Sequence, residues 1–327
     1  MKRLLLTTTL LATLSSGVSA ANFELTVLGS KGGIEDGNLT SFLLRSEMDK
    51  NYVTLDAGTI INGLNVANKQ GAFDHVDVPN NSEYGKVGYI LREKIKGYVI
   101  THSHLDHISG LIIASPEDTK KNIYGSEKTN KAIADTYFNW TAWPNFGNTG
   151  KGYKIGQYQY VNVDGSTPIS IAETSLNISS LAVNHPAPSS AFFITDNENT
   201  IAFFGDTGPD KVEKTESLKK VWTQLAPIQK SSKLNGLVIE VSFANATPDK
   251  ALFGHLTPNW LITELKRFEQ LSGGKGSLKG LKIVISHIKY GLKKGEDPKA
   301  IIKKQLDELN DLGVEFIIPT QGEQYRL

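Results

Sequence analysis

The 327-residue sequence contains no cysteine. Its fold therefore has no disulfide bonds, and any metal ion must be held by nitrogen and oxygen ligands. The sequence also lacks an excess of one charge, because 35 Lys and Arg residues face 34 Asp and Glu residues, for a net charge of +1. The basic residues are spread along the chain, so binding to a nucleic-acid polymer is not expected.

Long hydrophobic runs are absent as well. No segment approaches the roughly 18 consecutive apolar residues of a membrane-spanning helix. The first twenty residues have a basic start at Lys2 and Arg3, a short apolar stretch, and a small-x-small ending at Val18 and Ala20. This pattern predicts a secretory signal peptide over residues 1–20, and hence a periplasmic or secreted protein without a membrane anchor.

The full sequence is 39% hydrophobic and 21% charged, which is the composition of a globular protein with a large core. Strand-like apolar runs come first in each half, and alternating strands and helices follow, which predicts two packed sheets under outer helices. A helix is expected at 127–137, and a last strand at 314–322. No linker or repeat interrupts residues 21–327, which we therefore treat as a single metallo-hydrolase domain.

The stretch THSHLDHISG, residues 101–110, places three histidines and an aspartate within six positions. It follows the β-type run KGYVI, so the motif is expected at the carboxyl end of a strand. Alternate residues of an extended chain point the same way, so His102 and His104 can hold one ion together. Asp106 and His107, on the turn into the next helix, would then face a second ion.

Two ions need more ligands than this motif provides, and three other apolar runs end in suitable residues. His185, Asp206 and His287 each follow a β-type run directly. Each histidine taken alone is compatible with a hydrogen-bonded surface residue. The combination favours a site for two divalent ions, with zinc expected and manganese or iron left open.

These residues resemble the ligands of the metallo-β-lactamase superfamily, whose members share an αββα sandwich of two mixed β-sheets flanked by helices. The longer stretch HSHLDHISGLIIASP is similar to the signature of class II 3′,5′-cyclic nucleotide phosphodiesterases. The resemblance extends from Leu55 to Ser286. It implies a bridging Asp206, an ion held by His102, His104 and His185, and another held by Asp106, His107 and His287.

The resemblance also implies a reaction. The enzyme would hydrolyse cyclic AMP, or cyclic GMP, to the nucleoside 5′-monophosphate with a hydroxide activated by two metal ions. Asp106 and His255 would belong to the catalytic set, with His255 donating a proton to the leaving O3′ and Glu240 orienting it. Without the resemblance, His255 reads as a loop histidine. Asp56 would be either a buried support for a ligand or a simple turn cap.

An aromatic run follows the helix expected at 127–137. Its members Tyr137, Phe138, Trp140 and Trp143 either stack a purine base or form a packed surface loop. His75 has no strand-end context and is expected at the surface or at the edge of a cleft.

Three rival functions remain to be weighed. Another exported hydrolase of this fold, such as a β-lactamase, lactonase or sulfatase, would use the same ligands. Processing of transfer-RNA 3′ ends is suggested by GHLTP and SHIKYG, but the balanced charge argues against it. A binding protein with an inactive site is disfavoured because all seven ligand positions are filled. The sequence does not decide the native metal, the preferred nucleotide, or whether the protein forms a homodimer.

Overall fold

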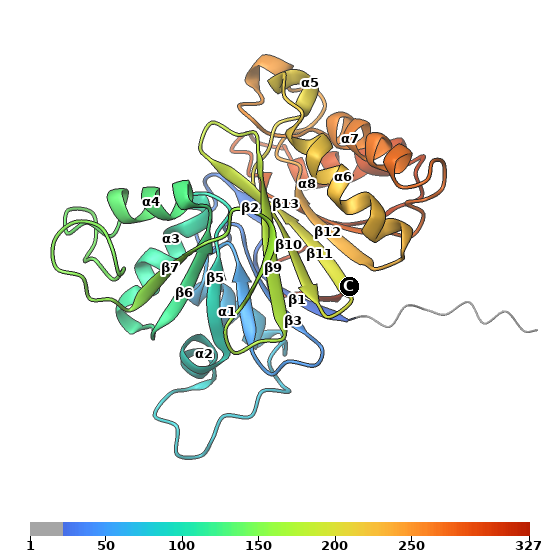
Figure 1. The fold of residues 1–327 in the computed structure, drawn as a ribbon. Coiled ribbons are helices and arrows are strands. Elements are labelled where there is room, and N and C mark those ends of the chain that lie inside the picture. The colour runs from blue at the N-terminus through green and yellow to red at the C-terminus, as the bar shows by residue number, and fades with distance from the viewer. Residues whose placement is uncertain (1–21) are drawn as a thin grey trace, which may run out of the picture.

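The computed structural model describes residues 22–327 as two β-sheets packed face to face between layers of helices (Figure 1). The predicted signal peptide lies outside the described residues. No helix within residues 22–327 is long and apolar enough to cross a membrane.

The first sheet is mixed. Its four strands nearest one edge pair antiparallel, and the pairs from β4 to β7 are parallel. In spatial order the seven strands are β16 (Gln324–Arg326), β1 (Phe23–Gly29), β3 (Ser41–Ser46), β4 (Tyr52–Leu55), β5 (Ile95–Val99), β6 (Lys121–Gly125) and β7 (Tyr158–Asn162).

The second sheet is mixed in the same way, with parallel pairs from β11 to β15 and antiparallel pairs from β8 to β11. Its order is β15 (Glu315–Ile317), β13 (Lys282–Ser286), β12 (Leu234–Glu240), β11 (Asn199–Phe204), β10 (Ser189–Asp196), β9 (Leu176–Val183) and β8 (Gly165–Ser170). A small parallel ribbon joins β2 (Lys31–Gly32) to β14 (Ile288–Lys289).

Helices cover the outer faces of both sheets. The first half of the chain contributes α1 (Ile61–Lys69), α2 (Lys86–Tyr89), α3 (Leu105–Ala114) and α4 (Glu127–Thr136). The second half contributes α5 (Asp210–Glu213), α6 (Ser217–Lys230), α7 (Pro258–Leu271) and α8 (Pro298–Leu309). Short π- or 3-10-helical turns occupy Ile90–Lys94, Ser115–Glu117 and Asp249–Ala251.

Three apolar clusters separate the four layers. The central cluster is formed between the sheets, where the rings of Phe42 and Phe203 meet edge to face. A second cluster lies between the first sheet and helices that include α1, α3 and α4, and a third packs α6, α7 and α8 on the second sheet. Strands such as β1 are therefore buried on both faces, which explains their nearly continuous apolar runs. The predicted αββα sandwich is confirmed.

The local predictions hold in part. Helix α4 begins after Ser126, whose hydroxyl accepts a hydrogen bond from the Thr129 N–H as an N-cap. The strand expected to be last is shorter than predicted, and a further strand, β16, follows it and pairs with β1. Helix α6 is an element for which the sequence analysis makes no prediction, and its interior Pro227 lacks a backbone donor. Packing of its apolar face outweighs that cost.

Candidate metal centre

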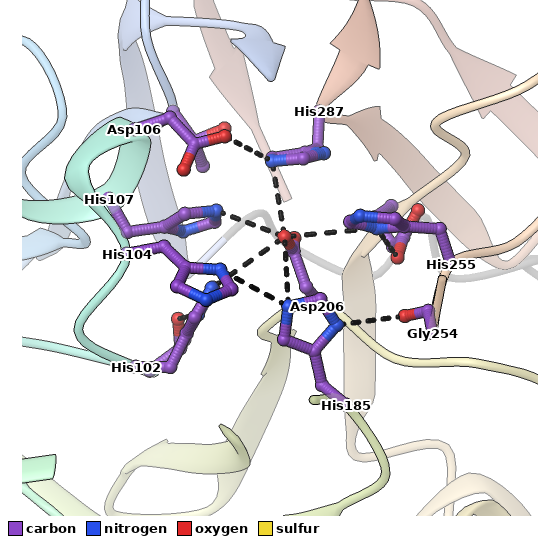
Figure 2. Close-up of polar contacts among 12 residues, drawn as sticks. His102, His104, Asp106, His107, His185, Asp206, Gly254, His255 and His287 are labelled. Atoms are coloured by element: carbon purple, nitrogen blue, oxygen red, sulfur yellow. Dashed lines mark hydrogen bonds and ion pairs between the residues drawn. The ribbon is translucent and has the colours of Figure 1, made fainter. Parts of the chain in front are cut away.

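The four residues of the HSHLDH motif lie where β5 leads into α3. His102 and His104 are in the extended segment before the helix, and Asp106 and His107 are in its first turn. The remaining three predicted ligands follow β9, β11 and β13, which run in the same direction, so their carboxyl ends reach one edge of the second sheet. The two sheets thus bring all seven side chains to a common centre (Figure 2).

Asp206 is at the middle of this cluster, as Figure 2 shows. Its Oδ2 atom is 3.2 Å from His287 Nε2 and 3.3 Å from His107 Nε2. The same oxygen is 3.7 Å from His102 Nε2 and 4.0 Å from His185 Nε2. One carboxylate therefore faces imidazoles from both sheets, which is the arrangement expected of a bridging ligand.

The donor atoms form two main groups, each with atoms within 4.8 Å of one another. The first group contains His102, His104, His185 and Asp206, and the second contains Asp106, His107 and His287. A third, overlapping group joins His255 to Asp206 and His287. The histidines and Asp106 divide as in the set that the resemblance implies, whereas Asp206 belongs to the first and third groups and not to the second.

Four of the five ligand histidines hold their Nδ1 atoms in hydrogen bonds away from the centre, whereas His104 Nδ1 is 3.3 Å from His185 Nε2. His107 Nδ1 is 2.7 Å from Asp56 Oδ2, and His185 Nδ1 is 3.0 Å from the Gly254 carbonyl oxygen. The carbonyl oxygen can only accept, and Asp56 also accepts from the N–H and the hydroxyl of Thr101, so each Nδ1 is the donor and each Nε2 faces the cluster.

Two hydroxyls extend this pattern. Thr101 Oγ1 donates to Asp56 and is 3.1 Å from His102 Nδ1, which can therefore donate to it. Ser242 Oγ donates to Glu240 Oε2 and is 2.9 Å from His287 Nδ1. Two buried carboxylates thus orient ligand histidines through a hydroxyl. Neither Thr101 nor Ser242 was identified from the sequence, although each is within two residues of a predicted site residue.

Two buried imidazole nitrogens without hydrogen bonds indicate whether the cluster fits a metal ion. Among residues 22–327, His102 Nε2 and His107 Nε2 are buried and make no hydrogen bond. A buried polar atom without a partner costs about 1–3 kcal/mol. Both atoms point into the cluster of carboxylates and imidazoles, so a divalent cation would satisfy them.

The protonation states agree with this assignment. Burial lowers the pKa of His102 well below its usual range and lowers that of His185 to about 4, so both imidazoles are neutral at pH 7. Burial also lowers the pKa of His107, but Asp206 and Asp56 outweigh it and raise the pKa above its ordinary value. That carboxylate-held proton is what a bound cation would replace.

Backbone conformation is unusual at two of these residues. Asp56 has a φ of 53° and His287 a φ of 59°, a region that residues other than glycine rarely adopt. Such strained conformations gather at functional sites, where the surrounding structure enforces them. Asp56 is also buried and accepts from the Thr101 N–H and from His107, so it supports the centre rather than simply capping a turn.

His255 and Glu240 form the pair that the sequence predicted. His255 Nδ1 is 2.8 Å from Glu240 Oε1, and Glu240 also accepts from the N–H groups of Thr207 and Ser242. Burial lowers the pKa of His255, and the charge of Lys289 adds to this, but Glu240 and Asp206 outweigh both and raise the pKa above its ordinary value. The two carboxylates therefore favour the protonated form of His255.

The aromatic run does not form one base-stacking surface. Phe138 is fully buried and packs on Phe146 and Tyr158, so the prediction that Phe138 stacks a base is wrong. Tyr137 donates its hydroxyl hydrogen to the Ser103 carbonyl oxygen, between the two motif histidines.

The two tryptophans of the aromatic run donate hydrogen bonds to groups outside the ligand cluster. Trp143 Nε1 donates to Ser115 Oγ, and the half-exposed Trp140 donates to the Tyr153 carbonyl oxygen. His75 is at the surface, 2.9 Å from the Tyr52 hydroxyl and outside the cluster.

Comparison with known proteins places this site in a family. The model of the family "cAMP phosphodiesterases class-II" matches residues 23–322. A 3′,5′-cyclic-nucleotide phosphodiesterase of Aliivibrio fischeri is 55% identical over 317 residues, which cover 96% of this chain and 96% of that protein.

Solved structures agree at the level of the fold. The crystal structure of unliganded yeast PDE1 has a TM-score of 0.79 at 24% identity, covering 94% of this chain and 100% of the other. The metallo-β-lactamase fold protein YhfI from Bacillus subtilis has a TM-score of 0.59 at 17% identity, covering 93% and 98%. The sandwich is thus a metallo-β-lactamase fold, and the chain belongs to the class II cAMP phosphodiesterases.

Proposed function

We propose that this protein hydrolyses 3′,5′-cyclic AMP, and also cyclic GMP, to nucleoside 5′-monophosphates at the Asp206-centred cluster. The observation that carries the proposal is the convergence of two ligand groups on one carboxylate in a member of this family. Phosphodiester hydrolysis is chemistry to which such a pair of cation sites is suited.

We assign His102, His104 and His185 to one divalent ion, Asp106, His107 and His287 to a second, and Asp206 to both. Zinc is the metal we propose, since imidazole and carboxylate ligands suit it. Ions bound there would lower the pKa of a water molecule and neutralise charge on the phosphoryl group. Asp56, Thr101 and Ser242 keep the ligand nitrogens directed inward.

Asp106 acts in this scheme as a ligand. Burial would favour its neutral acid, but the hydrogen bond from His287 and the charge of His107 hold its pKa well below the usual range. The Gly33 N–H donates to the same carboxylate at 2.8 Å. A carboxylate kept ionised so strongly is a weak base, so we assign it to cation binding rather than proton transfer.

His255 supplies the proton that the leaving group needs. Once the water has released a proton to solvent, the resulting hydroxide attacks phosphorus and the bond to O3′ breaks. The leaving alkoxide takes a proton from His255, and the phosphate stays on O5′. Glu240 holds the imidazolium in place at 2.8 Å and accepts three backbone N–H groups, which fixes its own orientation.

The proposal includes export to the periplasm or the medium. It is supported by the basic start, short apolar stretch and small-residue ending of the first twenty residues. Cell fractionation and N-terminal sequencing of the purified protein test it, and a mature chain that begins at Ala21 is the expected result.

Product analysis tests the reaction itself. The purified protein is incubated with cyclic AMP, cyclic GMP or a β-lactam, with and without a chelator, and products are identified by chromatography and phosphorus NMR. Formation of 5′-monophosphate that stops with the chelator is expected. Formation of the 3′-monophosphate would overturn the O3′ leaving-group scheme, and turnover of the β-lactam alone would favour the rival hydrolase.

A further inference from the structure

Lys289 lies directly beside the metal centre without belonging to it. In the small ribbon, Lys289 pairs with Gly32, and Ile288 pairs with Lys31. Paired residues on neighbouring strands share a face. A Cβ atom added to Gly32 would be 2.3 Å from the His287 ring. The side of the ribbon on which that Cβ atom would lie therefore faces the metal centre. Lys289 therefore leaves the ribbon on that face, while Ile288 is buried on the other.

Two contacts locate the Lys289 side chain more closely. Its Nζ atom is 5.5 Å from the centroid of the Phe243 ring, and that ring is 5.8 Å from the His255 ring. Its Cδ atom would be 4.0 Å from a Cβ on Gly33, whose N–H donates to Asp106. The half-buried stem thus runs between Phe243 and Gly33, near both the proton donor and the second ligand group.

The ammonium group of Lys289 has no ion-pair partner in the part of the chain that the structure describes. Among residues 22–327, its ammonium makes neither an ion pair nor a hydrogen bond, whereas Asp106, Asp206 and Glu240 are each held by several donors. Packing of the stem on Phe243 is an ordinary way for lysine to cover apolar surface. Packing does not explain why the lysine ammonium lies next to a cluster that binds cations. The ammonium and the bound ions would repel one another unless an anion lay between them.

We propose that Lys289 binds a non-bridging phosphate oxygen of the nucleotide, a role that rests on the proposed function. An ammonium on a flexible stem offers three donors and reaches a phosphate as a point charge. The phosphate would then be held between the ligand cluster on one side and Lys289 on the other. Lys289 would strengthen binding of both the cyclic substrate and the 5′-monophosphate product.

The experiment compares Lys289→Gln and Lys289→Arg with a matched control, Lys294→Gln. Lys294 is an exposed lysine in the loop that follows, so its substitution removes the same charge away from the centre. For each variant, kcat and KM for cyclic AMP, inhibition by 5′-AMP and bound metal are measured. We expect Lys289→Gln to lower kcat/KM and weaken 5′-AMP inhibition by about tenfold or more. Lys289→Arg should recover part of both, with bound metal unchanged.

Lys294→Gln should behave as the unsubstituted protein. The proposal is overturned if the two glutamine variants match, or if Lys289→Gln loses metal in proportion to its loss of activity. Should the unsubstituted protein fail to turn over cyclic AMP, the proposed function fails on its own. In that case, calorimetry measures binding of inorganic phosphate to the metal-loaded protein and to its metal-loaded Lys289→Gln variant. Equal binding to the two, or no binding to either, rejects the proposed role of Lys289.

Discussion

His107 Nδ1 and Asp56 Oδ2 are 2.7 Å apart, and this buried contact decides which imidazole nitrogen faces Asp206. Asp56 accepts the hydrogen bond from Nδ1, so His107 must present an unprotonated Nε2 when a cation is bound. Asp56 and His107 are 51 positions apart in the chain, on different elements of the first half of the fold.

Asp56→Asn should weaken metal binding by about 10- to 100-fold. An asparagine fills nearly the same volume, but its amide can donate to Nδ1 and so place the histidine proton on Nε2. Competition with a chromogenic chelator measures the affinity, and unfolding of the metal-free protein controls for misfolding. Metal affinity equal to that of the unsubstituted protein would show that the contact does not set the tautomer.

Gly32→Ala should also release metal, for a steric reason. The added methyl group would be 2.3 Å from the His287 ring, so the ring must move away from Asp106 and Asp206. A loss of about tenfold in affinity is expected for one displaced ligand. Gly85→Ala is the matched control, because nothing lies within 4 Å of its Cβ and its φ of −67° suits alanine. Equal affinity in the two variants would contradict this reading.

His255→Ala should reduce kcat by about 100-fold while bound metal is nearly unchanged, since loss of a general acid costs about that much. The raised pKa of His255 predicts that the unsubstituted enzyme loses activity at alkaline pH, where the proton is lost. The variant should lack this alkaline decline. Metal analysis alongside the pH profile distinguishes a proton donor from a metal ligand. Loss of metal from the variant would show that His255 is a ligand.

Phe138→Ala should destabilise the fold by about 3–5 kcal/mol, because it empties a buried aromatic position. In conditions where the variant is folded, its KM for cyclic AMP should be unchanged. Trp140→Ala removes a side chain that is 49% exposed and should cost much less stability. Denaturant titration and steady-state kinetics check both, and a KM that rises only with Phe138→Ala would restore a substrate role.

Removing metal should lower the thermal midpoint of unfolding. Cations that bind only the folded protein stabilise it by about 2.7 kcal/mol at a hundredfold excess over the dissociation constant.

His104→Ala should reduce the difference in thermal midpoint between chelated and metal-loaded protein. It should also abolish turnover without altering the midpoint of the chelated protein, since His104 is exposed. Differential scanning calorimetry provides the comparison, and an unaffected midpoint after complete chelation would argue against this centre.

Much of the fold and of the candidate ligand set could be predicted because the signals are local. Nearly continuous apolar runs mark strands that are buried on both faces, and a polar residue directly after such a run marks a strand end. His102, His104, Asp106 and His107 are contiguous, and His185, Asp206 and His287 each follow a strand. Helix α6 forms in spite of its interior Pro227 because its apolar face packs on the second sheet.

The chain order alone therefore determined the layered architecture and the residues available to bind cations. Tertiary structure decided which nitrogen of each histidine points inward, that Phe138 packs in the core, and that the Lys289 side chain runs between Phe243 and Gly33. These features depend on contacts between segments as many as 181 positions apart, such as that between Asp106 and His287. No periodicity or motif records such a contact, because its geometry is set by how two sheets pack and not by neighbouring residues.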